Sequence, residues 1–180
     1  MSDSDLTKYH KKAIKVGVTN VKLIHPSSVV TAPWVRWKCQ FGCSYHGLTY
    51  CCPPHSPNHD QTRAVLDSYN RALLFHIELP ESEDRMKRFN KIHEMLVKME
   101  GEVFKDGFHK AFVLLFGPCP LCKECAKNEE KPCRLGDKAR PSMEGVGIDV
   151  YQTARNNGFF IKTLKKMTET QNLFALLLVD

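Results

Sequence analysis

The placement of cysteine constrains this chain more than any other feature. All eight cysteines fall in two short segments, 39–52 and 119–133, and none lies in an apolar stretch. We therefore expect both segments to be loops that leave the ends of core elements, where folds of this kind usually place their sites. The first segment holds Cys39, Cys43, Cys51 and Cys52, and the second holds Cys119, Cys122, Cys125 and Cys133.

The second segment has a spacing that wraps three thiolates around one small volume. Cys119, Cys122 and Cys125 follow a three-residue repeat, as in the loops by which bacterial ferredoxins hold iron–sulfur cubanes. Cys133 comes later than the fourth ferredoxin cysteine and precedes Arg134 instead of proline. The spacing thus matches the ferredoxin pattern for three ligands and departs from it at the fourth.

Disulfides are the first alternative to a metal site. The start of the sequence, Met1-Ser-Asp-Ser-Asp, has neither the basic nor the apolar part of a secretory signal, so we expect a cytoplasmic protein with reduced thiols. Clustered cysteines in that compartment more often bind metal or do redox chemistry. Since 42% of the residues are apolar, the chain can also bury a core without such staples.

The softness and spacing of the ligands narrow the choice of metal. Clusters of thiolates select zinc, copper(I) or iron–sulfur centres. Zinc prefers pairs of cysteines separated by a longer spacer. Three closely spaced cysteines suit a cubane better, because each of its iron atoms needs a single thiolate. We predict one or two 4Fe–4S clusters, with zinc as the alternative.

The adjacent pair Cys51 and Cys52 cannot easily serve one cluster, because neighbouring side chains diverge in extended backbone. Pro53 and Pro54 follow Cys52 and fix its direction, so we take Cys52 as a ligand and Cys51 as expendable. The first segment then offers three thiolates, which would leave one iron open. The predicted ligands are Cys39, Cys43, Cys52, Cys119, Cys122, Cys125 and Cys133.

Two polar features near the cysteines have two interpretations each. His46, His55 and His59 flank the first segment and are either a ligand or acid–base group or exposed loop residues. The turn from Ser142 to Asp149 contains two glycines. It either directs backbone N–H groups at an anionic centre or is a packing turn before a helix.

Apolar periodicity predicts an α/β fold, with α+β as a possibility. We expect a single twisted mixed sheet of about four to six strands with packed helices and two cysteine-rich metal loops. One domain is expected to span residues 1–180, with residues 1–7 as a disordered tail. The expected strands are Val29–Lys38, Arg71–Leu79, Ala111–Phe116, Phe159–Leu164 and Leu173–Val179, and the expected helices are Asp60–Tyr69, Asp84–Glu100 (stopped by Gly101) and Asp149–Asn157. Residues 8–23 are expected to form a short helix or strand.

These motifs together resemble a family of cysteine-rich predicted metal-binding proteins of unknown function. The resemblance rests on Trp34 to Cys43, on Cys52-Pro-Pro, on Gly117 to Arg134 and on Arg140 to Val150, and it extends from Trp34 to Val179. It implies a metal, most simply an iron–sulfur cluster, in mainly anaerobic bacteria and archaea. By position it implies the same seven cysteines as ligands and requires no cysteine at position 51.

Charge and hydropathy exclude other classes. The formal net charge is +6, but the basic residues are spread along the chain without an arginine-rich block, so we expect no nucleic-acid partner. No apolar run approaches the roughly 20 residues of a membrane span, so we expect no membrane association.

Three functions remain. The first is electron transfer, or a redox accessory role, with a redox partner protein. The second is an enzyme that uses an open three-cysteine cluster as a Lewis acid or sulfur acceptor. The third is a structural zinc module for protein interaction. The oligomeric state stays open.

Overall fold

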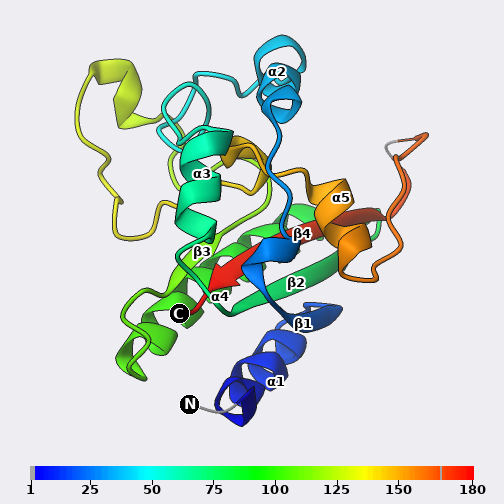
Figure 1. Ribbon diagram of the computed structural model, residues 1–180. Coiled ribbons are helices and arrows are strands. Elements are labelled where there is room, and N and C mark those ends of the chain that lie inside the picture. Colours follow the sequence, from blue (N-terminus) through cyan, green and yellow to red (C-terminus); the bar gives the residue numbers. More distant parts are fainter. Residues whose placement is uncertain (1–2, 167) are drawn as a thin grey trace.

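Four strands form one open sheet in the computed structural model, which describes residues 3–166 and 168–180. Across the sheet the order is β1 (Asn20–Ile24), β2 (Ala72–Leu79), β4 (Gln171–Leu178) and β3 (Phe112–Leu114). Every neighbouring pair is antiparallel, so β2 and β3 run in the same direction on either side of β4. Figure 1 shows the sheet at the centre of the molecule.

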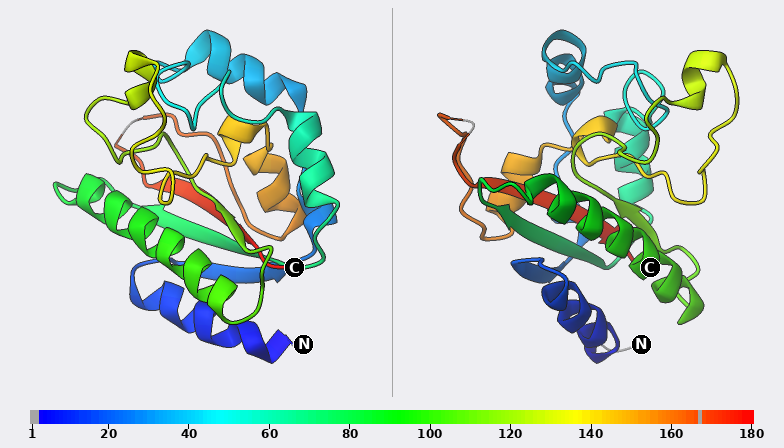
Figure 2. Two further views of the ribbon diagram at one scale, coloured as in Figure 1. Left: turned by 90° about the vertical axis from the view of Figure 1, so that its left-hand side faces the viewer. Right: turned by 180° about the vertical axis from the view of Figure 1, so that it is seen from behind.

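Helices cover both faces of this sheet (Figure 2). The helices are α1 (Thr7–Lys15), α2 (Pro33–Gly42), α3 (His59–Leu66), α4 (Arg85–Lys105) and α5 (Val150–Asn156). Short 3-10 helices are η1 (Asp3–Leu6), η2 (Pro26–Ser28), η3 (Ala126–Glu129) and η4 (Glu144–Val146). Apolar side chains of α1 and α4 pack on one face, and those of α3, η4 and α5 pack on the other.

Strand β2 shows why both faces must be covered. Seven of its eight residues are buried, with Glu78 as the exception, which is the near-continuous burial of a strand inside a two-sided core. Alternate side chains separate the two cores: Phe75 faces α1 and α4, whereas Leu74 faces α3 and α5. The predicted fold class, one sheet with packed helices, is confirmed, although we expected mixed strand directions and the sheet is antiparallel.

The predicted strand over Val29–Lys38 is wrong. Pro33 starts α2 at its first turn, where proline is well tolerated because no helical N–H is lost there. The alternation that suggested a strand came from aromatic residues that are exposed: Trp34 is 47% and Trp37 is 68% exposed. Val35 is the buried residue of this helix.

The expected strand over Phe159–Leu164 is also wrong, because this segment has no regular secondary structure. Phe159 and Ile161 pack against the core on the α5 side of the sheet, whereas Phe160 between them is 86% exposed. Helix α4 continues past Gly101 to Lys105, because Val103 beyond it is fully buried and tertiary packing outweighs the cost of a helical glycine.

At the start of the chain, part of the expected disordered tail is ordered. Residues Asp3–Leu6 form η1 and Leu6 lies in the core at 2% exposure; residues 1 and 2 lie outside the described part. The expected helix or strand over residues 8–23 is resolved into α1 followed by β1. No helix among the described residues is long and apolar enough to cross a membrane.

Candidate metal centre

Two long connections carry the cysteines. The first segment lies in the connection from β1 to β2, where it runs from the last turn of α2 towards α3, and the second lies in the connection from β3 to β4. The segments 39–52 and 119–133 lie side by side at one end of the molecule in Figures 1 and 2. Tyr50 Oη donates to Lys131 O at 2.8 Å. Two stretches far apart in sequence are thus brought together.

Helix α2 positions the first two cysteines. Cys39 lies in its last turn and Cys43 is the residue that ends it, with Cys43 N donating to Cys39 O at 3.2 Å. Tight turns hold Cys52, whose N–H donates to Thr49 O at 3.2 Å and whose carbonyl accepts from His55 N at 3.0 Å. Cys52 is buried, whereas Cys43 is exposed.

The turn from Ser142 to Asp149 fixes the first segment to the rest of the fold. Arg36 Nη1 of α2 donates to Gly145 O at 2.9 Å, and the buried Ser56 Oγ donates to the same oxygen at 2.6 Å. A Cβ at Gly145 would lie 3.2 Å from Cys51 O. Of the two interpretations of this turn, the structure shows the packing role.

Glu144 begins η4 in the same turn. Its Oε2 is inaccessible and has no hydrogen-bond partner among the described residues. Burial raises the pKa of this carboxyl. Its charge acts on Cys39, so the carboxyl belongs to the surroundings of the first cysteine segment.

Five cysteines line a cavity of about 190 Å³ between the two segments. They are Cys51, Cys119, Cys122, Cys125 and Cys133. The thiols of Cys51 and Cys119 interact, and this interaction lowers the pKa of Cys119 to about 6 and raises the pKa of Cys51. Cys51, which we expected to be expendable, therefore lies among the cysteines of the second segment.

The remaining cysteines, Cys39, Cys43 and Cys52, interact electrostatically with one another, and Cys52 also interacts with Cys119 and Cys125. Burial is the main cause that raises the pKa of Cys39 and Cys52, and neighbouring thiols raise it further. The neutral thiols of Cys39 and Cys52 are thus favoured in the absence of metal, whereas a bound cation would stabilise their thiolates.

All eight cysteines are free thiols, so the disulfide alternative is not what the structure shows. No three His, Cys, Asp or Glu side chains of the described residues converge as a ready site for one metal ion. The thiols instead surround a cavity, and an all-sulfur donor set fits the soft metals zinc, copper(I) and iron–sulfur centres.

The histidines beside the first segment have separate surroundings. His55 is exposed, and its ring packs edge-on against Tyr50 at 5.8 Å between centroids. His59 starts α3 and its Nε2 lies 3.4 Å from Asp60 Oδ1. His46 is half-buried.

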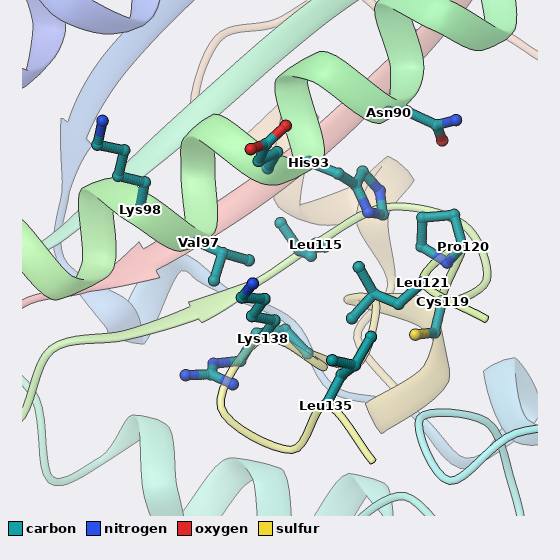
Figure 3. A pocket seen from close by; sticks show the side chains of 12 residues that line it. Asn90, His93, Val97, Lys98, Leu115, Cys119, Pro120, Leu121, Leu135 and Lys138 are labelled. Atoms are coloured by element: carbon teal, nitrogen blue, oxygen red, sulfur yellow. The ribbon is translucent and has the colours of Figure 1, made fainter. Parts of the chain in front are cut away.

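A larger cavity of about 620 Å³ adjoins the cysteines, and sequence reasoning missed it. It lies between α4 and the second cysteine segment, with Cys119, Leu121 and Leu135 shared by both cavities (Figure 3). His93 of α4 lines it: its Nε2 donates to Phe116 O at 2.7 Å. Burial lowers the pKa of His93 to about 4, so this ring is neutral at pH 7. Its place on the apolar face of the helix was the one sequence signal.

The fold and the gathered thiols define a cysteine-rich α/β protein with a candidate thiolate metal site. A family model described as "Predicted metal-binding protein (DUF2284)" matches residues 22–179. Because this match covers most of the 180 residues, the chain belongs to that family, which confirms the resemblance. No curated protein and no solved structure matches the chain.

Proposed function

We propose that this protein binds a 4Fe–4S iron–sulfur cluster through its cysteine thiolates and serves in electron transfer or as a redox accessory. One observation carries the proposal: five free thiols, from segments remote in sequence, surround a cavity of about 190 Å³. A single water occupies about 30 Å³ in the liquid, and one zinc ion held by sulfur at about 2.3 Å needs no such space. A centre of several metal atoms needs a cavity of this size.

The chain's own residues would determine how such a centre behaves. An iron–sulfur cluster supplies one-electron chemistry, and its potential depends on exposure and on hydrogen bonds to sulfur. Here Cys43 is exposed and most of the other cysteines are half-buried. Electrons would therefore have a short path between the centre and the protein surface.

A redox partner protein is part of this function. Helix α2, which carries Cys39, also presents Trp34, Trp37 and Phe41, which are 47, 68 and 79% exposed. Exposed aromatic residues that gather on one element are typical of protein contact surfaces. Thiolate ligands also require a reducing compartment, for which we propose the cytoplasm.

Anaerobic reconstitution tests the iron–sulfur assignment. The reduced protein is incubated with ferrous iron and sulfide, desalted, and analysed for iron, zinc and acid-labile sulfide. Reduction by dithionite is then followed by electron paramagnetic resonance. We expect iron and sulfide in equal amounts and a reducible cluster. Stoichiometric zinc without sulfide would instead establish the zinc alternative, and no bound metal would overturn both.

Two matched variants make this experiment specific. Cys125→Ser removes one thiol of the cavity, and Lys123→Ser changes a neighbouring residue of the same segment that carries no sulfur. Iron and sulfide should fall in Cys125→Ser and remain at the wild-type level in Lys123→Ser. Equal iron content in all three proteins would count against thiolate ligation at Cys125.

The cavity of about 620 Å³ supports enzymatic use of the centre as a second candidate function. Its volume lies within the range of small-molecule sites, and its lining includes Cys119 as well as Lys98 and Lys138. A small thiol such as dithiothreitol should then change the electron paramagnetic resonance spectrum of the reconstituted protein. Val97→Phe, which fills the cavity from α4, should abolish this change while iron content is retained. An unchanged spectrum after the thiol is added would rule out this candidate function.

A further inference from the structure

Cys51 and Cys52 are neighbours in sequence, yet the structure places them in different groups of cysteines. Cys51 lines the five-cysteine cavity together with the four cysteines of the second segment. Cys52 does not contribute to the lining of that cavity. The thiols that act electrostatically on Cys52 are, in order of effect, Cys43, Cys119 and Cys125.

The backbone fixes this division. Ser56 N donates to Cys52 O at 3.2 Å, which holds the residue in a turn. The carbonyl of Cys51 packs against Gly145, where an added Cβ would lie 3.2 Å from the oxygen. Since consecutive side chains leave the backbone in different directions, one residue of the pair faces each group.

We propose that Cys51 is a ligand of the metal centre held by the second segment, with Cys119, Cys122 and Cys133, and that Cys52 serves a separate centre with Cys39 and Cys43. This inference rests on the proposed metal-binding function. Cys119 and Cys125 line the cavity and also interact electrostatically with Cys52, and the role of Cys51 is the same whichever centre takes Cys125. The side chains of Cys51 and Cys52 diverge too much to serve one cluster easily. The same divergence allows each of them to serve a different centre.

Metal analysis of four variants tests the division. Cys51→Ser, Cys133→Ser and Cys52→Ser each remove one thiol, and Ser44→Ala changes an exposed residue of the first segment as the control. After anaerobic reconstitution, Cys51→Ser and Cys133→Ser should each lose about half of the iron and sulfide and retain the same residual spectrum. Cys52→Ser should lose the other half, with a different residual spectrum. Ser44→Ala should match the wild type.

The outcomes separate this inference from the proposed function. Wild-type protein without any bound metal would overturn the function. Loaded wild-type protein with an unchanged metal content in Cys51→Ser would overturn only the role of Cys51, as would an identical residual spectrum for Cys51→Ser and Cys52→Ser. If the wild type takes zinc instead of iron, the zinc contents of the same variants decide the question.

A measurement on unmodified protein covers the case in which Cys51→Ser folds poorly. Wild-type protein is treated with iodoacetamide before and after metal loading, and each cysteine is quantified by mass spectrometry. Cys51 and Cys133 should both become protected on loading. Equal alkylation of Cys51 in the loaded and metal-free proteins would rule it out as a ligand.

Discussion

Arg140 and Glu100 form a bidentate ion pair between α4 and the chain that follows the second cysteine segment. Arg140 Nη2 lies 2.6 Å from Glu100 Oε1, and Arg140 Nε lies 2.9 Å from Oε2. Oε2 also accepts a hydrogen bond from Val113 N at 2.7 Å. The side chains of Arg140 and Glu100 are only 14 and 11% exposed. The pair therefore joins α4, β3 and the chain that follows Cys133.

Arg140→Met should lower the free energy of unfolding by about 3 kcal/mol or more, because it leaves the Glu100 carboxylate buried without its partner. Urea unfolding of the metal-free protein measures this. Arg134→Met breaks the exposed pair with Glu129 and should leave the midpoint nearly unchanged. Adding Glu100→Gln to Arg140→Met should recover part of the loss, since it removes the unpaired charge. A wild-type midpoint for Arg140→Met would show that the pair contributes nothing.

Two glycines should respond to alanine in opposite directions. Gly147 has φ +85°, and a Cβ there would lie 2.8 Å from His59 Cβ. Gly147→Ala should therefore destabilise the protein by about 1–3 kcal/mol, from backbone strain and overpacking. Gly101 lies within α4 with open space around it. Gly101→Ala should stabilise by about 0.5–1 kcal/mol, because alanine favours helix. Thermal unfolding of both variants measures the signs, and a shift of both midpoints in the same direction would contradict this prediction.

The sequence predicted the elements whose apolar pattern reflects burial. Strands β2 and β4 and helix α4 follow such patterns, and all three supply residues of the core. Helix α2 was missed because its aromatic residues are exposed and their local alternation imitates a strand. An alternation of two that lasts only four residues does not distinguish a strand from a helix. The spacing of Trp34, Trp37 and Phe41 fits a helix.

For the site, sequence clustering was enough to predict two cysteine-bearing segments, although Cys39 lies in the last turn of α2 and not in a loop. It was not enough to place Cys51. Because the side chains of Cys51 and Cys52 diverge, one cluster cannot easily take both, but the fold brings the second cysteine segment next to Cys51. Sequence patterns also do not predict that α4 lines the large cavity or that Glu100 pairs with Arg140. Both features depend on tertiary packing. Metal binding by the seven cysteines stays a prediction.

Ser56→Ala should weaken the attachment of the first cysteine segment. Ser56 is 6% exposed; its Oγ donates to Gly145 O at 2.6 Å and accepts from Arg36 Nη1 at 3.0 Å. Loss of this buried hydroxyl should cost about 1–3 kcal/mol in urea unfolding. Ser68→Ala removes an exposed hydroxyl that bonds only Val65 O in the same turn and serves as the control. Equal midpoints for the two variants would argue against a special role of Ser56.

His93 should make the metal-free protein lose stability in mild acid. The pKa of His93 lies near 4 in the folded state, against 6.5 for an ordinary histidine, because burial disfavours the charged ring. The contribution of the neutral His93 ring to the free energy of unfolding is therefore complete above about pH 6.5. It is lost as the pH falls towards 4 and amounts to about 3 kcal/mol.

His93→Gln removes this titration while an amide N–H can still reach Phe116 O. Urea unfolding between pH 7 and pH 4.5 should show a flatter decline for His93→Gln than for the wild type. His109→Gln changes an exposed histidine and should follow the wild-type decline. All three proteins carry the same carboxyl groups, so the difference between the curves isolates the imidazole. Parallel curves for His93→Gln and wild type would contradict this prediction, because they would mean that folding leaves the pKa of His93 unchanged.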